Sequence, residues 1–311
     1  MTFIEKCKAV MIGHAVGDAL GVPVEFSNRE MLDNNPVTDM RDFGTYAVPK
    51  GSWSDDTSMS IAALDAIGEY GLNFDRIMQN FGKWYYHSEF TPTGKIFDVG
   101  NTCSEAIENF FKLKLPLNQC GLMGDYSNGN GSLMRIHPFV LYTANMPYPI
   151  EEKLKIIHTA SALTHAHKRS QIGCGIYAFI LWELLENPVK ESIYRGLSKA
   201  KAYYNGEEQL RCYARLFSAG FKNIGRDLIR SGGYIVESLE AAVWCLLTTN
   251  SYKEAVLKAV NLGYDTDTVG AICGGLAGAL YGYESIPQTW RDALLKREYI
   301  ESLCDKAFKD C

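Results

Sequence analysis

Glycine recurs at every fourth position in two apolar segments of this sequence. One segment lies near the start of the chain and the other near its end: Gly13, Gly17 and Gly21, then Gly270, Gly274, Gly278 and Gly282. Residues four apart lie on one face of a helix. Each glycine in a helix interior costs about 1 kcal/mol relative to alanine, unless a close neighbour requires it. The spacing therefore predicts two buried helices whose backbones approach their partners closely and whose ends can meet at one point.

Helical periodicity dominates the rest of the chain, and alternating strand patterns are nearly absent. The segments expected to be helical are 4–20, 54–70, 102–114, 150–163, 168–187, 207–221, 235–249, 251–262, 267–282 and 288–309. Capping boxes, Thr102 with Glu105 and Ser251 with Glu254, support two of these starts. Loops are expected at 21–53, 88–101 and 116–132. We therefore predict one all-α domain covering residues 1–311.

Composition limits the classes of function. Hydrophobic residues make up 47% and charged residues 22%, as in ordinary globular enzymes, and the net charge of −5 favours neither nucleic acid nor anionic membranes. The nine cysteines include no C-x-x-C pair, which favours reduced thiols over a disulfide framework or a zinc site. No apolar run reaches the roughly 20 residues of a membrane span. We expect a soluble, cytoplasmic monomer without membrane or general nucleic-acid binding.

Two clusters of acidic and hydroxyl residues each begin a predicted helix, at 54–57 (Ser-Asp-Asp-Thr) and at 265–268 (Asp-Thr-Asp-Thr). Either cluster alone fits helix capping, because Ser, Thr and Asp are preferred N-caps and acids in the first turn suit the helix dipole. A cap needs only one acceptor, however, and each cluster offers two carboxylates and a hydroxyl. Four carboxylates brought together would repel unless a divalent cation lay between them. These hard oxygen donors favour Mg²⁺ or Mn²⁺ over zinc.

The second acidic cluster also fits a different motif, the D-x-D-x-[TV] nucleophile of haloacid-dehalogenase phosphatases. That motif follows a buried strand at the start of a doubly wound domain. Here the preceding residues, 251–264, have helical spacing, and only residues 269–311 follow. The phosphatase interpretation fails on this context.

A polar loop, SNGNGSLMRIHP at 127–138, is predicted to run into a short helix at Ser132. Backbone N–H groups at such a junction can hold a phosphate, and Arg135 can add positive charge. It is no Walker loop, because no lysine follows the glycines, and an ordinary turn is the alternative.

Two other polar positions are less informative alone. His165 lies in LTHAHKRS, a polar break between helices, where a hydrogen-bonding role is more plausible than zinc ligation. Asp98 precedes the predicted helix start at Thr102 and by itself indicates only a turn.

Six segments in this order resemble the ADP-ribosylglycohydrolase family, including its dinitrogenase-reductase-activating type. They are GHAVGDALGVPVEF (13–26), GSWSDDTSM (51–59), DVGNT (98–102), GNGSLMR (129–135), LTHAHKRS (163–170) and NLGYDTDTVGAICGGLAGALYG (261–282). Several are weak individually, but the six in series are highly specific and span most of the chain.

The resemblance implies a single-domain multi-helix orthogonal bundle with a central dinuclear Mg²⁺ or Mn²⁺ site. It implies hydrolysis of the glycosidic bond at ribose C1″ of an ADP-ribosyl group, released from a protein side chain such as arginine or serine. The implied metal ligands are Ser54, Asp55, Asp56, Asp265, Asp267 and Thr268. Glu25 and Asp98 match acidic residues beside the metals and the scissile bond, and either is a candidate general base.

The resemblance also implies substrate contacts. The loop would hold the diphosphate and His165 would lie on the ribose side, so the candidate binding residues are Asn101, Gly129, Asn130, Gly131, Ser132, Met134, Arg135, His165 and Tyr264. Ser54 stands where the family often has threonine, and it keeps the hydroxyl. Tyr264 stands where a small or acidic residue is usual, and its phenol is expected to stack on substrate or narrow the entrance.

Two other functions fit the same scaffold. The chain could hydrolyse a free ADP-ribose or nicotinamide-type conjugate, or it could bind ADP-ribose without catalysis. The complete acidic set argues against the second, because a protein that only binds has no need of all four aspartates.

Overall fold

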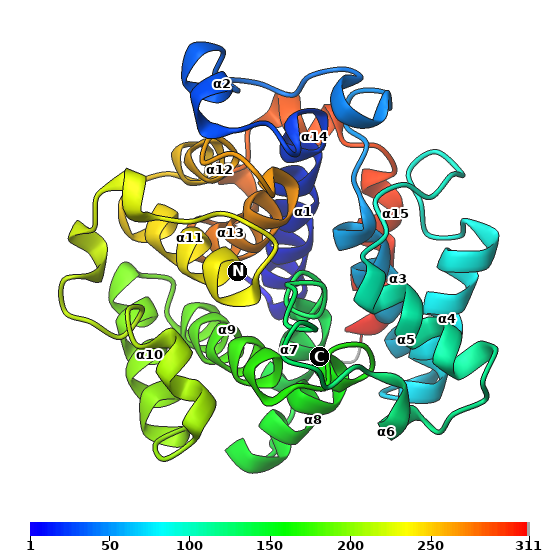
Figure 1. The fold of residues 1–311 in the computed structure, drawn as a ribbon. Coiled ribbons are helices and arrows are strands. Elements are labelled where there is room, and N and C mark those ends of the chain that lie inside the picture. The colour runs from blue at the N-terminus through cyan, green and yellow to red at the C-terminus, as the bar shows by residue number, and fades with distance from the viewer. Residues whose placement is uncertain (310–311) are drawn as a thin grey trace.

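The computed structural model describes residues 1–309, and within that range the regular structure is entirely helical (Figure 1). The α-helices are α1 (Phe3–Gly21), α2 (Arg29–Asn34), α3 (Asp55–Tyr70), α4 (Phe74–His87), α5 (Asn101–Phe111), α6 (Leu117–Cys120), α7 (His137–Ala144), α8 (Ile150–Ala162), α9 (Lys168–Glu186), α10 (Lys190–Tyr203), α11 (Ile235–Leu247), α12 (Tyr252–Val260), α13 (Thr266–Tyr281), α14 (Gln288–Ala293) and α15 (Arg297–Ala307). Short 3₁₀ turns cover Val22–Val24, Gly44–Tyr46, Glu208–Tyr213, Phe221–Asn223, Arg226–Leu228 and Tyr283–Ser285. The all-α prediction is confirmed.

Helices α1 and α13 lie side by side at the centre of the molecule, dark blue and orange in Figure 1. A Cβ placed on Gly17 would lie 2.1 Å from the carbonyl oxygen of Gly270, and one on Gly274 would lie 2.2 Å from that of Gly13. No side chain fits at that separation, so glycine is required at these contacts. The predicted close approach is confirmed.

Gly282 is an exception to the predicted ridge. It is the C-cap of α13 with φ 83°, a conformation that glycine adopts easily and other residues rarely do. A Cβ there would meet only the terminal methyl of Met1, at 3.2 Å. Its fourth-residue spacing therefore reflects the end of the helix and not helix–helix packing.

The two central helices run antiparallel, because Gly13 faces Gly274 while Gly21 faces Asp267. A Cβ on Gly21 would lie 2.3 Å from the Cα of Asp267. The hydroxyl of Thr266 donates a 2.8 Å hydrogen bond to the carbonyl oxygen of Gly21 and fixes this register. The carboxyl end of α1 is therefore held against the amino end of α13.

The change Gly17→Ala is expected to destabilise the protein despite alanine's higher helix propensity. Propensity favours alanine by about 1 kcal/mol, but the new methyl group would overlap backbone that cannot rotate away. Overpacking of this kind costs typically 1–3 kcal/mol and sometimes more, so after the gain in propensity the net loss in unfolding free energy should be up to about 2 kcal/mol. Urea denaturation would measure it. Gly225→Ala is the control, because a Cβ there meets nothing within 4 Å; equal stability of the two variants would contradict the close contact.

Two predicted helices are not continuous. Residues 207–221 contain a 3₁₀ turn at Glu208–Tyr213 and the start of another at Phe221–Asn223, and no α-helix. Tyr213 and Phe221 are buried in the core from these turns. The predicted helix 288–309 is interrupted between α14 and α15, where Lys296 has φ 54° and Leu295 N donates to Gly51 O at 3.0 Å. Apolar spacing did not distinguish these local departures from a regular helix.

Other helix predictions also need correction. The sequence analysis missed α2, α4, α6, α7 and α10, although Asn73 caps α4 by accepting from Arg76 N at 3.1 Å. The proposed capping box at Thr102 is wrong, because α5 begins at Asn101 after Gly100 and has no side-chain cap. The cap at Ser251 is confirmed, since its hydroxyl accepts from Glu254 N at 3.2 Å.

Within residues 1–309 no helix has the length and apolar character needed to cross a membrane. Among residues 1–309 no cysteine forms a disulfide, and most are buried.

Candidate active site

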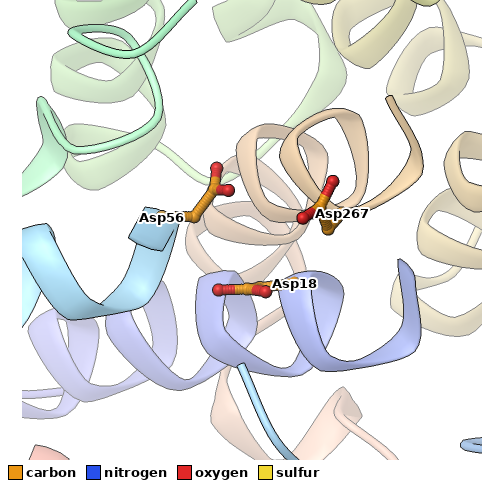
Figure 2. Close-up of side chains that lie close together, drawn as sticks. All are labelled: Asp18, Asp56 and Asp267. Atoms are coloured by element: carbon orange, nitrogen blue, oxygen red, sulfur yellow. The ribbon is translucent and has the colours of Figure 1, made fainter. Parts of the chain in front are cut away.

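Three helices bring carboxylates together where α1 ends and α3 and α13 begin (Figure 2). Asp18, Asp56 and Asp267 each place one carboxylate oxygen within 4.8 Å of the other two. Glu25, Asp265 and Asp267 form a second such group, so the two groups share Asp267. The predicted convergence of the two acidic clusters is found, and Asp18 and Glu25 complete it.

Asp18 lies in the segment 13–26 that carries the family resemblance, but it was not among the predicted site residues. It is fully buried on α1, and its Oδ1 accepts a 2.9 Å hydrogen bond from Ser54 N. Its Oδ2 accepts from the backbone N and hydroxyl of Thr57 at 3.1 and 2.6 Å. Asp18 thus holds the start of α3 against α1. The sequence signal for it is an acidic residue between Gly17 and Gly21, in the glycine-spaced part of the N-terminal helix.

Helix capping explains only part of the two acidic clusters. The Ser54 hydroxyl caps α3 by accepting from Asp56 N at 3.3 Å. Asp265 stands at the N-cap position of α13 but makes no capping hydrogen bond, and its Oδ2 instead accepts from Asn130 Nδ2 at 2.8 Å. Asp56 and Asp267 are fully buried, and neither is the N-cap residue of its helix.

The buried carboxylates have unused oxygen atoms. Oε2 of Glu25, Oδ1 of Asp56 and Oδ2 of Asp267 are buried and have no hydrogen-bond partner within residues 1–309. Burial and the neighbouring acids raise the pKa of Asp56 and Asp267 well above the ordinary value, and burial with the charge of Asp98 raises that of Glu25 to about 9. A divalent cation among these oxygens would favour the charged forms.

The donor set therefore fits a hard divalent cation. The hydroxyls of Ser54 and Thr268 both donate to Oδ2 of Asp56, at 2.9 and 3.2 Å, so they lie at the same centre as the carboxylates. Asp55 lies to one side, where its carboxyl interacts with that of Asp98. Carboxylate and hydroxyl oxygens without a soft ligand suit Mg²⁺ or Mn²⁺.

A pocket of about 350 Å³ opens beside these carboxylates. The predicted site residues that line it are Glu25, Asp55, Asp98, Asn101, Gly129, Asn130, Gly131, Met134, His165, Asp265 and Thr268. The exposed rings of Phe26 and Tyr126 also line it, and neither was among the candidates. The pocket brings acidic groups, a polar loop and aromatic surface to one place.

Tyr46 is a further site residue that the sequence analysis missed. Its phenol interacts with the carboxyl groups of both Glu25 and Asp98, and its ring packs on Phe97 with centroids 4.9 Å apart. The neighbouring Thr45 hydroxyl donates to the carbonyl oxygen of Glu25 at 2.9 Å. One short 3₁₀ turn therefore links the two candidate general bases. No local motif around Tyr46 indicated this.

The backbone has positive φ at one of these acids and next to the other. Asp98 has φ 50°, and Phe26, next to Glu25, has φ 65°. Residues other than glycine rarely adopt positive φ, and such strain gathers at functional sites.

Three candidate binding residues do not have side chains in the pocket. Arg135 is fully buried and donates to Ala160 O and the Thr164 hydroxyl, so it cannot place its charge on a substrate phosphate as predicted. The hydroxyl of Ser132 is buried against Cys174. Tyr264 is half exposed and lines a neighbouring hollow with Arg29.

The predicted short helix at Ser132 is also wrong. Residues 130–136 form successive turns, in which Leu133 N and Met134 N both donate to Asn130 O, and α7 begins only at His137. Asn130 also donates to the side chains of Ser238 and Asp265, at 2.9 and 2.8 Å. The loop is held at the pocket by these contacts and not by a helix terminus.

The fold and the site together define an all-α protein with a buried carboxylate centre beside a pocket. The family model described as ADP-ribosylglycohydrolase matches residues 1–311. The chain belongs to the ADP-ribosylglycohydrolase family, and it is an enzyme of that family.

Named relatives cover nearly the whole chain. It is 33% identical over 307 residues to ADP-ribosylarginine hydrolase Tri1 of Serratia proteamaculans, covering 98% of this chain and 79% of that protein. It is 28% identical over 296 residues to ADP-ribosyl-[dinitrogen reductase] glycohydrolase of Rhodospirillum rubrum, covering 93% and 90%. A solved structure, titled ADP-ribosylglycohydrolase-related protein complex, superimposes with a TM-score of 0.83 at 29% identity, over 99% and 98% of the two chains.

Proposed function

We propose that this enzyme hydrolyses the bond between ribose C1″ and an arginine side chain in ADP-ribosylated protein, with two Mg²⁺ or Mn²⁺ ions bound. The observation that carries the proposal is the pair of carboxylate groups that share Asp267 beside the pocket. The choice of arginine rests on the relatives, one of which is named for that linkage. Serine and free conjugates are alternatives that the assay below distinguishes.

The metal ligands we propose are the six predicted residues, Ser54, Asp55, Asp56, Asp265, Asp267 and Thr268. Bound ions would fix the ribose hydroxyls and polarise water, as two-metal sites do. Asp18 already accepts three hydrogen bonds from the start of α3, so we assign it the role of positioning Asp56. Asp18, which was not among the predicted residues, would therefore belong to the same centre without being a metal ligand.

The chain's own acids would move the proton. Glycoside cleavage passes through a positively charged, oxocarbenium-like state that nearby carboxylates stabilise. Glu25 or Asp98 would accept the proton of the attacking water, and the Tyr46 phenol between them would hold their carboxyl groups in place. The loop at 129–131 and His165 would bind the diphosphate and ribose.

The setting we propose is the cytoplasm, where thiols stay reduced, since the cysteines of residues 1–309 form no disulfide. The partner would be an ADP-ribosylated protein or a small ADP-ribosyl conjugate.

Turnover is expected on ADP-ribosyl-arginine and should be lost in EDTA, because every proposed ligand is a hard oxygen. The assay compares ADP-ribosyl-arginine, ADP-ribosyl-serine and free nicotinamide conjugates, each with Mg²⁺, Mn²⁺, Zn²⁺ or chelator. Mg²⁺ or Mn²⁺ should restore the chelated enzyme, and Zn²⁺ should do so poorly. Full activity after exhaustive chelation would refute the metal site. Faster turnover of a free conjugate than of ADP-ribosyl-arginine would identify the free conjugate as the substrate.

A further inference from the structure

A buried chain of hydrogen bonds runs from Arg135 to the pocket. Arg135 Nη2 donates to Thr164 Oγ1 at 2.7 Å, and Thr164 Oγ1 lies 2.9 Å from His165 Nδ1. Arg135 and Thr164 are fully buried, and His165 lines the pocket. The arginine that does not reach the pocket is thus connected to a residue that does.

The backbone around His165 is held from both sides. His165 N donates to Ser161 O at 2.8 Å, and the Ser161 hydroxyl donates to His165 O at 3.0 Å. The imidazole packs against the loop at 129–131, since a Cβ on Gly131 would lie 2.9 Å from its Cε1. A Cβ on Gly129 would lie 3.6 Å from Nε2. The Nε2 edge of the ring therefore faces the loop that lines the pocket.

The direction of each hydrogen bond follows from the groups involved. A guanidinium has donors and no acceptor, so the Thr164 oxygen must accept from Arg135. Burial and the charge of Arg135 lower the pKa of His165 to about 3, so the imidazole is neutral and carries one N–H. The hydroxyl proton of Thr164 has two neighbours that can accept it, Nδ1 of His165 and Sγ of Cys103. The imidazole nitrogen is the stronger acceptor, because sulfur accepts weakly.

We propose that Arg135, acting through the Thr164 hydroxyl, holds His165 in the tautomer protonated at Nε2. A neutral imidazole then presents a hydrogen-bond donor to the pocket, where it selects an oxygen acceptor such as a ribose hydroxyl or a diphosphate oxygen. Arg135 and Thr164 are positioning residues, and only His165 meets the ligand. The identity of that ligand rests on the proposed function, whereas the tautomer does not.

The tautomer is measured directly by ¹⁵N NMR of protein labelled at the histidine ring nitrogens. The chain has 6 histidines, and comparison with His165→Gln identifies the signals of His165. We expect the proton on Nε2, with Nδ1 showing the shift of an acceptor nitrogen. A wild-type spectrum with the proton on Nδ1 overturns the inference.

Variants at Thr164 test the link to Arg135. Thr164→Val removes the hydroxyl and should abolish the single tautomer, with ADP-ribose affinity in Mg²⁺ falling by up to about 10-fold, the upper effect of one ordinary hydrogen bond. Thr164→Ser keeps the hydroxyl and should keep both properties. Thr143→Val is the control, because that buried hydroxyl bonds only to carbonyl oxygens of its own helix region, Phe139 O and Val140 O.

Unchanged tautomer and affinity in Thr164→Val would overturn the inference. If Thr164→Val does not fold, Thr164→Ser and the wild-type spectrum decide it, since loss of the Nε2 proton in either refutes the assignment. The tautomer inference and the proposed function can fail independently of each other. An enzyme that turns over no ADP-ribosyl substrate would refute that function and leave the tautomer measurable.

Discussion

Asp267→Asn should abolish most of the thermal stabilisation that Mg²⁺ gives the wild-type protein, together with catalytic activity. Asp267 belongs to both carboxylate groups, and its Oδ2 is buried without a hydrogen-bond partner among residues 1–309. A ligand that binds only the folded state stabilises it by about 2.7 kcal/mol at a hundredfold excess over Kd. An amide replaces a charged ligand poorly, so the variant should gain much less. Melting temperatures with and without Mg²⁺ measure the difference.

The same change is expected to make the metal-free protein more stable. Burial and the charges of Glu25 and Asp56 disfavour the ionised form of Asp267 and raise its pKa well above the ordinary value. Asparagine removes that charge and caps helices about as well as aspartate does. Asp75→Asn is the matched control, because Asp75 lies in the first turn of α4. Equal Mg²⁺-induced shifts in wild type and Asp267→Asn would mean that Asp267 only serves the helix end.

Glu25→Gln should lower kcat by about 10² to 10⁴-fold while ADP-ribose affinity stays close to wild type. The amide keeps the shape of the side chain but cannot accept a proton, and loss of a general base typically has this effect. Glu25 lines the pocket, and its Oε2 is buried with no hydrogen-bond partner in the described part of the chain, 1–309. Single-turnover kinetics with calorimetric measurement of ADP-ribose binding would separate the two effects.

Asp98→Asn is the informative comparison, because Tyr46 interacts with both acids. If Glu25→Gln keeps near wild-type kcat while Asp98→Asn is inactive, Asp98 is the base. Glu30→Gln controls for loss of an acidic charge, since Glu30 is exposed on α2. A fall in kcat with Glu30→Gln as large as with Glu25→Gln would instead indicate a long-range charge effect.

The central geometry of this protein could be predicted from sequence because its causes are local. Glycine at every fourth residue has one physical explanation in a helix, a neighbour too close for any side chain, and Gly17 against Gly270 confirms it. Each acidic cluster has two carboxylates and a hydroxyl in four residues, which is more than a helix cap needs. The two clusters were therefore expected to lie together in the fold, and Asp56 and Asp267 do belong to one carboxylate group.

Other parts of the site depended on contacts that no local pattern encodes. Asp18 lies in the segment 13–26 that carries the family resemblance, but it was not among the candidate site residues. It belongs to the centre because the antiparallel pairing of α1 and α13 places it beside Asp267. Tyr46 reaches Glu25 and Asp98 from a turn in a segment that was expected to be featureless loop.

For Arg135 the sequence indicated the position in the chain but not the direction of the side chain. The sequence placed it correctly next to the glycine-rich loop, and its charge suggested a phosphate contact. The guanidinium lies at the end of a long side chain, however, so it can point into the pocket or into the core. The turns at 130–136 direct it into the core, where it donates to Ala160 O and the Thr164 hydroxyl. Residue type and spacing determined which chemistry this protein carries. The packing of helices far apart in sequence decided which of those side chains meet, because side-chain direction depends on three-dimensional neighbours.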